Sequence, residues 1–233
     1  MRAIDLNAIP DGEVSCVSML DGLCASLGFD YASYATISPV TGDILGYATY
    51  PDEWKAHYVR RGFHRIDPTL TETALCIAPV EWSRFDKNAR FHTVFSEARE
   101  FGITPQGLTI PVRGPYGDHG LLSVTRDCSE PEWSRLVHAT TGALQLAAVR
   151  LHDEVLHSGQ VHQTLSRPVL STRELEILQW IAAGKSQQDV GDILSISHRT
   201  VEVHLRSSRE KLGTLTTAQA IGRAIGFRLI HPG

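Results

Sequence analysis

The sequence predicts an α+β chain in two parts. Residues 1–158 are expected to form an α-β-α sandwich, in which helices flank an antiparallel sheet, and residues 170–233 an all-α domain of four helices. Two observations support this division. Strand-like and helix-like apolar periods alternate along the first part, and closely spaced helix-capping sequences mark the second. Residues 159–169 are polar, contain Gly, Ser and Pro, and lack periodicity, which is typical of a linker.

The first part opens with an amphipathic helix and a hairpin. An apolar stripe over residues 11–27 stops at Gly28, where glycine commonly ends a helix. The runs 31–37 and 44–50 flank the turn sequence Ser-Pro-Val-Thr-Gly-Asp, which predicts a β-hairpin. The later predicted elements are helices at 52–61 and about 88–101, strands at 107–113 and 120–125 around a Gly-Pro-Tyr-Gly-Asp-His loop, and a long helix from Glu132 to about His157.

Capping sequences locate the helices of the second part. Ser171 with Glu174, and Ser186 with Asp189, fit the capping box that satisfies the first free N–H groups of a helix. Ser197 is placed to cap a third helix. The predicted buried stripes are Leu175, Leu178 and Ile181 on the first helix, Val190, Ile193 and Leu194 on the second, and Val201, Leu205, Ser208 and Leu212 on the third.

The other side of the third helix carries hydroxyls, imidazole and cations. Any small helical bundle has a polar outer face, so this pattern alone favours plain solvation. The distribution of charge along the chain favours DNA binding over plain solvation. Residues 159–233 hold nine Lys and Arg against six Asp and Glu, a net charge of +3, whereas the rest of the chain carries −7. A basic tail on an acidic body favours binding to DNA phosphates.

The residues that follow Val169 resemble a known DNA-binding module. The sequence L-S-x-R-E-x-E-x-L-x-W-x-A-x-G-K from Leu170 to Lys185, then S-x-R-T-V-x-x-H from Ser197, is similar to the LuxR-type helix-turn-helix. The resemblance implies that the third helix enters the major groove while neighbouring elements bind phosphates. It departs from the family at 215–217, Leu-Thr-Thr, where Asn and Arg are usual. The implied DNA-binding residues are Lys185, Ser197, Arg199, Thr200, His204, Arg206 and Lys211.

The long helix of the first part admits two interpretations. Its stripe is Trp133, Val137, Thr140, Leu144, Ala148, Leu151 and Val155, which is longer than one sheet face is expected to bury. It either packs on its own sheet or forms a homodimer interface. The modest charge of the basic tail favours the homodimer, because one copy would make few DNA contacts.

Several classes of protein are excluded. No apolar stretch reaches the roughly 18 residues of a membrane span and no signal sequence is evident, so a cytoplasmic location is expected. The four cysteines lack C-x-x-C spacing and are expected to be buried free thiols. No histidine spacing predicts a metal site, and neither a phospho-acceptor arrangement nor a catalytic motif is present. We therefore expect no enzyme, no metal and no cofactor.

Aromatic residues gather around one carboxylate between residues 47 and 85. Trp54 and Tyr58 are four residues apart, so they share a helix face, and Asp67-Pro68 follows as an extended turn. Such a set either lines a pocket for a largely apolar ligand with an N–H group, or is an ordinary core in which Asp67 caps a turn. The set is Tyr47, Tyr50, Trp54, Tyr58, Phe63, Asp67, Trp82 and Phe85.

The spacing of Trp54, Tyr58, Asp67-Pro68 and Trp82, followed by Phe-Gly-Ile at 101–103 and Gly-Leu-Thr-Ile-Pro at 107–111, resembles the autoinducer-binding domain of LuxR-type quorum-sensing regulators. The resemblance implies an N-acyl-homoserine lactone as ligand. Trp54 would donate to the lactone carbonyl and Asp67 would accept the amide N–H, while Tyr50 and Ser123, on facing strands, would hold the amide carbonyl. Tyr58 and Trp82 would line the head group and acyl chain. One extra residue near Pro105-Gln106 departs from the pattern.

The expected regulator is a homodimer that binds a palindromic operator under control of the small-molecule autoinducer, with RNA polymerase as a further candidate partner and no membrane contact. Both signs of control fit the residues, since the ligand either promotes or releases DNA binding. Two alternatives stay open: a ligand-independent regulator whose upstream domain serves protein interaction, and a sensor of a non-lactone small molecule. A lactone-cleaving enzyme fused to a DNA module is disfavoured by the missing nucleophile arrangement.

Overall fold

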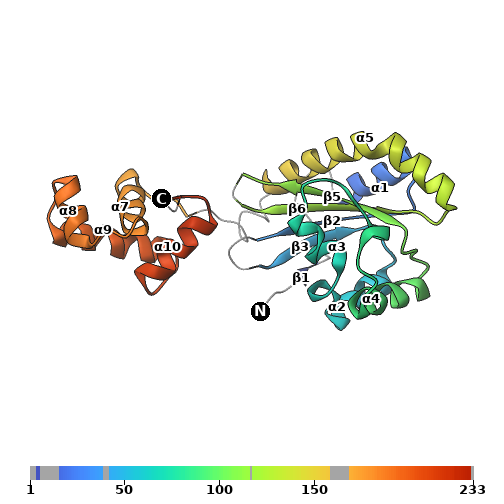
Figure 1. Ribbon diagram of the computed structural model, residues 1–233, viewed down its shortest axis with the longest axis horizontal. Helices are drawn as coiled ribbons and strands as arrows, with labels where there is room; N and C mark the ends of the chain where they lie inside the picture. The colour runs from blue at the N-terminus through green and yellow to red at the C-terminus, as the bar shows by residue number, and fades with distance from the viewer. Residues whose placement is uncertain (1–3, 6–15, 39–41, 116, 158–167, 232–233) are drawn as a thin grey trace. The chain divides into compact units, whose positions relative to one another are not determined.

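The computed structural model describes residues 4–5, 16–38, 42–115, 117–157 and 168–231 (Figure 1). The chain divides into two compact units, Met1–Leu165 and Ser166–Gly233, and each is described by itself. Four sequence expectations lie wholly or partly outside the described residues: the start of the helix at 11–27, the turn at 38–43, the loop containing Tyr116, and most of the linker at 159–169.

In the described part of the first unit, six strands form one sheet in the order β1-β3-β2-β6-β5-β4. The two predicted hairpins are confirmed, because β2 pairs antiparallel with β3 and β5 with β6. The two hairpins join through antiparallel β2–β6 pairing, and β1 pairs with β3 in parallel. The strands are β1 (Ile4–Asp5), β2 (Tyr31–Ile37), β3 (Ile44–Ala48), β4 (Val80–Glu81), β5 (Gly107–Arg113) and β6 (His119–Thr125).

Two details of the sheet differ from the expectation. The strand predicted to run to Tyr50 ends at Ala48, because the chain must turn there to reach Pro51, which precedes α2 (Asp52–Arg61). Strands β1 and β4 were not predicted, since two residues are too few to show a period.

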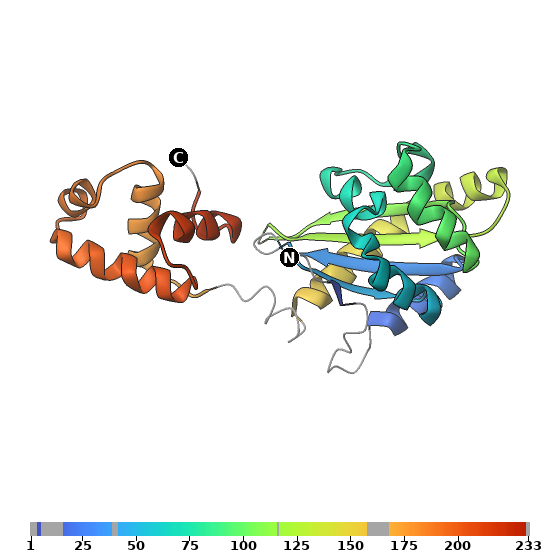
Figure 2. The same cartoon turned by 90° about the horizontal axis from the view of Figure 1, so that it is seen from below.

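Helices cover both faces of the sheet, which confirms the α-β-α sandwich (Figures 1 and 2). One face carries α1 (Cys16–Leu27) and α5 (Glu130–His157). The other carries α2, α3 (Pro68–Thr71) and α4 (Ala89–Glu100), joined by the 3-10 turns η1 (Phe63–Arg65), η2 (Thr73–Leu75) and η3 (Trp82–Arg84). Of the four free cysteines, Cys16 and Cys24 are buried, as predicted, whereas Cys76 and Cys128 are only half-buried.

The apolar stripe of α5 packs inside its own unit. Trp133, Leu144, Ala148, Leu151 and Val155 are buried in one core cluster with residues of α1 and the sheet. This favours the interpretation in which the stripe packs within its own unit over the one in which it forms a homodimer interface. The reason is that α1 lies beside α5 and closes the same core, so the covering surface is wider than the sheet alone.

The second unit contains α7 (Thr172–Ala182), α8 (Gln187–Leu194), α9 (His198–Lys211) and α10 (Thr217–Gly226). Both predicted capping boxes are present, and Ser197 accepts from the Thr200 N–H at the start of α9. The predicted buried stripe of α9 is confirmed, but on α7 Ile177 is buried whereas Leu175 and Ile181 are half-buried. On α8, Ile193 is 44% exposed, because the short helix turns only one side to α9.

Candidate ligand pocket and DNA interface

A pocket lies between the sheet and the layer formed by α2, α3 and α4. It holds about 680 Å³ of space between its atoms, counting the open mouth. The structure brings all the predicted ligand-binding residues to this pocket, although they come from four separate segments of the chain. They are Tyr50, Trp54, Tyr58, Asp67, Trp82 and Ser123.

Asp67 is a buried acceptor in the pocket wall. Its Oδ1 accepts from the Thr69 N–H at 2.8 Å, and its Oδ2 accepts from the Tyr58 hydroxyl at 2.7 Å. The carboxylate therefore caps α3, as the plainer interpretation of the sequence expected, and lines the pocket as well. The two roles are compatible because a carboxylate has about four acceptor positions.

Burial controls the ionisation of this group. It raises the pKa of Asp67, while the hydrogen bonds from Tyr58 and Thr69 act in the lowering direction. Burial, and then the negative charge of Asp67, raise the pKa of Tyr58 well above its usual value. The phenol consequently stays protonated and donates to the carboxylate.

Trp54 stands beside this pair on the same face of α2. Its ring meets the ring of Tyr58 edge to face, with centroids 5.7 Å apart, and contacts the rings of Phe63 and Phe101. Among the described residues, the Trp54 indole N–H has no hydrogen-bond acceptor in the protein. By contrast, the Trp82 indole donates to Thr109 Oγ1 at 2.8 Å. Trp54 thus lines the pocket with an N–H group that can donate to a ligand.

The predicted placement of Tyr50 and Ser123 on facing strands was wrong. Tyr50 follows β3, and β2 lies between β3 and the strand of Ser123, β6. Ser33 on β2 fills the gap, since it is the register partner of Ser123 and lines the pocket together with Tyr50. Thr109 on β5 completes the row, with its hydroxyl 2.8 Å from Ser123 Oγ.

Sequence reasoning missed Ser33 and Thr109 because hydroxyls are common in strands. The signal was available only as alternation: Ser33 and Ala35 share one face of β2, and both line the pocket. Small residues on the sheet, Ala35, Gly46 and Ala48, leave room above them. The pocket therefore combines a polar end with an apolar remainder.

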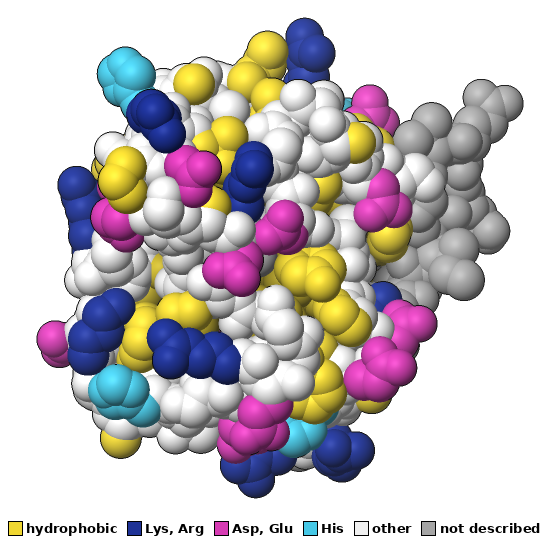
Figure 3. Space-filling view, turned by 90° about the vertical axis from the view of Figure 1, so that its right-hand side faces the viewer, with side chains coloured by type: hydrophobic (Ala, Val, Ile, Leu, Met, Phe, Trp, Pro, Cys, Tyr) yellow, Lys and Arg dark blue, Asp and Glu magenta, His cyan; other side chains and the backbone are white. Residues whose placement is uncertain are grey.

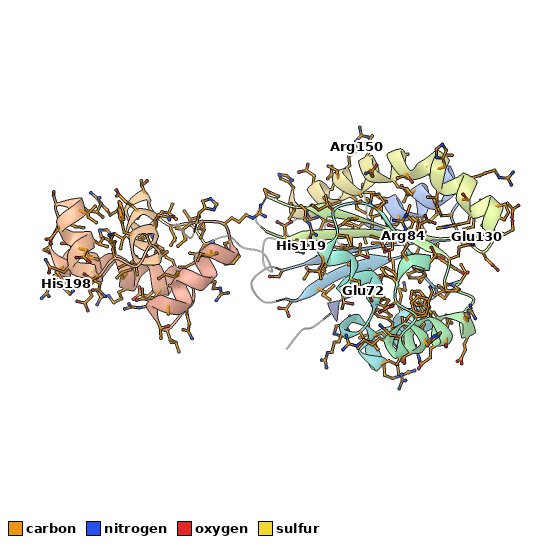
Figure 4. All side chains as sticks on the ribbon, in the orientation of Figure 1. Glu72, Arg84, His119, Glu130, Arg150 and His198 are labelled. Carbon is orange, nitrogen blue, oxygen red and sulfur yellow. The ribbon has the colours of Figure 1, made fainter. Side chains whose placement is uncertain are left out.

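In the second unit, α9 presents the expected cationic face. His198, labelled in Figure 4, is its first residue. Arg199 and Arg206 are exposed, and Thr200 and His204 are half-buried. Lys185 is exposed beyond the end of α7, and Ser197 is exposed while its hydroxyl caps α9.

Lys211 has a different position from the other predicted DNA-binding residues. Its Nζ lies 2.8 and 2.9 Å from the two oxygens of Glu174, which also accepts from Ser207 and from the Ser171 N–H. Burial by itself raises the pKa of Glu174, but these hydrogen bonds lower it to about 2. Lys211 therefore ties the end of α9 to the start of α7.

Comparison with known protein families gives two matches that together span most of the chain. The model of the autoinducer binding domain matches residues 13–155, and that of bacterial regulatory proteins of the luxR family matches residues 168–224. The chain belongs to the LuxR family. It is accordingly a DNA-binding transcriptional regulator with an autoinducer-binding domain, and not an enzyme.

Curated relatives agree with this assignment. The transcriptional activator protein RaiR of Rhizobium etli is 35% identical over 74% of this chain and 72% of its own. The quorum sensing-dependent transcriptional regulator RpaR of Rhodopseudomonas palustris is 30% identical over 92% of this chain and 88% of its own. An HTH-type regulator of Sinorhizobium fredii is 34% identical over 78% of this chain, which spans 56% of that relative.

A solved structure of SdiA in complex with octanoyl-rac-glycerol matches with a TM-score of 0.74 and 25% identity, over 93% of this chain and 89% of that chain.

Regulators of the LuxR family bind an autoinducer and use no cofactor. Within the described ranges, no three His, Cys, Asp or Glu side chains are grouped to hold a metal ion. In the described part of the chain, each helix is too short or too polar to span a bilayer.

In this LuxR-family chain, residues 215–217 are Leu-Thr-Thr where Asn and Arg are expected. These residues form the start of α10. The Thr216 hydroxyl accepts from the Gln219 N–H and the Gln219 side chain accepts from the Thr216 N–H, which makes a further capping box. Arg209 donates to Thr217 Oγ1 at 3.1 Å and so joins α9 to α10. The departure thus serves helix packing.

Proposed function

We propose that this regulator binds an N-acyl-homoserine lactone and that the ligand controls binding of a homodimer to a palindromic operator. The observation that carries the proposal is the pairing of a buried acceptor, Asp67, with the unused indole donor of Trp54 in one pocket. An acyl amide beside a lactone carbonyl needs one of each. A ligand without a carbonyl would cover the Trp54 N–H and leave it unpaired, at a cost of about 1–3 kcal/mol.

The other polar groups fit the remaining atom of the head group. The Tyr50 hydroxyl, beside Ser33, and the Ser123 hydroxyl, beside Thr109, supply donors for the amide carbonyl. Tyr58 holds the Asp67 carboxylate in place, and Trp82 covers the head group from the η3 side. The acyl chain would lie over Ala35, Gly46 and Leu70, where the lining is apolar.

A non-lactone ligand is the second candidate, and the SdiA complex is the observation that favours it. Octanoyl-glycerol shares an acyl chain with the lactones but has an ester and hydroxyls instead of an amide. It offers Asp67 a hydroxyl donor and offers Trp54 a carbonyl acceptor. The two ligand classes therefore differ mainly in whether an N–H reaches Asp67.

The homodimer is proposed on the outer side of α1 and α5. The stripe first assigned to the interface is buried, but Leu146 and Val149 of α5 are 53% and 55% exposed. A groove beside them is lined by Met19 and Leu23 of α1 and Ala143 of α5. An apolar face of this kind on a surface helix is typical of a contact between identical subunits.

For the DNA contact we propose that Arg199, Thr200, His204 and Arg206 of α9 reach base edges in the major groove, and that Lys185 and Ser197 bind phosphates. Lys211, held by Glu174, would act through the position of α9 and a phosphate contact. In a dimer the two α9 helices would read half-sites about 34 Å apart. RNA polymerase stays a candidate partner.

The test is a titration of the full-length protein with lactones of graded chain length and with octanoyl-glycerol. Thermal stability and binding to a palindromic operator selected by the protein are both measured. A ligand at a hundredfold excess over its Kd should stabilise the protein by about 2.7 kcal/mol. The Asp67→Asn variant should lose the response to lactones, because the amide keeps only one acceptor oxygen and puts a donating NH2 group in place of the other, whereas Asp86→Asn, an exposed control, should keep it.

A protein that responds to no lactone would refute the lactone proposal, and a response to octanoyl-glycerol alone would favour the second candidate. If Asp67→Asn binds the operator as wild type does and neither protein responds to any ligand, the upstream unit serves interaction instead.

A further inference from the structure

A second groove lies on the far side of the aromatic wall of the ligand pocket. We propose that it binds a small amphipathic carboxylate, such as a medium-chain alkyl or an aryl carboxylate, as a separate ligand. The groove is bounded by α4, the loop at 104–107, and the start of α5, where Glu130 is labelled in Figure 4. It holds about 1220 Å³ of space, counting its open mouth.

The groove has an apolar floor and a polar rim. Its floor consists of buried residues, chiefly Phe91, Phe95 and Trp133, and its sides include half-buried Pro105 and Cys128. Its rim is polar and exposed. Figure 3 looks toward the end of the molecule at which α5 begins, and hydrophobic side chains are visible there between charged ones. A site for an amphipathic molecule needs this combination of an apolar floor and a few charged groups.

The charges on the rim favour an anion. Two cations, Lys87 and Arg99, line it, against one acid, Glu130. The Lys87 ammonium lies 4.0 Å from the centroid of the Phe91 ring and 3.2 Å from the Trp82 carbonyl oxygen, so it is held over the floor. Glu130 accepts from the Gln106 amide at 3.1 Å on the opposite side. A single carboxylate would therefore bind at Lys87 and Arg99, with its apolar part directed toward Pro105 and Trp133.

One layer of rings separates this groove from the ligand pocket. Phe95 lines both spaces. Trp82 lines the pocket and packs on Gly107, which lines the groove, so closely that a Cβ there would lie 2.5 Å from the indole. The Trp82 and Phe95 centroids are 5.2 Å apart. The two ligands would thus contact opposite sides of one aromatic wall without sharing a space.

The probe is sodium decanoate below its micelle concentration, titrated calorimetrically into full-length protein, with 1-decanol as the uncharged probe. Lys87→Gln and Arg99→Gln should each weaken decanoate binding about two- to fivefold, and the double variant about tenfold, with little change for decanol. Arg90→Gln is the matched control, since Arg90 is an exposed cation on α4 outside the groove. Glu130→Gln should tighten binding about twofold, because it removes the one repelling charge.

Asp67→Asn separates the groove from the ligand pocket. A carboxylate in the pocket would bind more tightly once the Asp67 charge is gone, whereas one in the groove would be unaffected. The proposal is overturned if wild type does not bind decanoate, if the double variant stays within twofold of Arg90→Gln, or if Asp67→Asn is the change that dominates. All groove substitutions are at exposed side chains, and equal melting temperatures would verify that each variant is folded. No lactone is needed, so the result is independent of the proposed function.

Discussion

The two units of this chain, each taken by itself, are stabilised by different kinds of internal interaction. In the second unit the helix ends are fixed by neighbours in the sequence, as at Ser186 with Asp189. In the first, the pocket joins groups that are far apart, as where Tyr58 donates to Asp67 and Ser33 is the register partner of Ser123. Local interactions thus set where the helices of the second unit begin, whereas the pocket of the first unit exists only once distant segments have come together.

The largest expected effect tests whether the helical unit is stabilised by its own core. Leu205 is fully buried in α9, so Leu205→Ala should destabilise this unit by about 2–5 kcal/mol. Hydrogen exchange measured on the full chain should show faster exchange in α7–α10 and unchanged protection in β2–β6. Val203→Ala, at a 48% exposed position of the same helix, is the control. Equal loss of protection in the sheet would show that the two units are not independent.

The next effect concerns the unused donor in the pocket. Trp54→Phe keeps a ring but removes the indole N–H, so the affinity for a responsive lactone should fall by about 1–3 kcal/mol, which is about thirtyfold at the middle of that range. Trp133→Phe is a matched control, because its indole donates to Glu81 at 3.2 Å instead of lining the ligand pocket. Calorimetric titration would measure both. Similar losses in the two variants would argue that ring packing, and not the N–H, is what matters.

Acid should weaken the helical unit through Glu174. The folded-state pKa of about 2 lies below the ordinary value of 4.5, so the stabilisation is complete above pH 4.5 and is lost as pH falls from there toward 2. Since the Lys211 partner is partly exposed, we expect a contribution of about 2 kcal/mol. Denaturant unfolding followed by helical circular dichroism between pH 7 and pH 3 would measure it. Glu174→Gln should flatten this dependence, and an unchanged slope would contradict the assignment.

The smallest expected effect on stability comes from removing a single helix cap. Ser186→Ala removes the hydroxyl that accepts from the Asp189 N–H at 3.1 Å, so the helical unit should lose about 1 kcal/mol. Gln187→Ala, one residue along, should change stability little because alanine is a good helix former. The same unfolding measurement compares them. An equal effect of both variants would mean that α8 is fixed by packing with α9 and not by its capping box.

The sequence predicted more of the helical unit than of the pocket. The capping residues Ser171, Ser186 and Ser197 were identifiable because each acts on an N–H only three residues away. That Trp54 and Tyr58 lie on one face of a helix was predictable for a related reason, since residues four apart on a helix return to the same face. Ser33 and Thr109 were not, because their position depends on which strands become neighbours.

By itself, the sequence determined the two hairpins, the starts of α7, α8 and α9, and the α9 stripe, since these follow from periodicity and from contacts within a few residues. Only the tertiary structure decided how the strands are ordered, and hence that Ser33 lies between Tyr50 and Ser123. It also decided that α1 shares in burying the α5 stripe and that Lys211 turns inward to Glu174. The physical reason is common to all of these: each depends on surfaces brought together from distant segments, and period and spacing describe only one segment at a time.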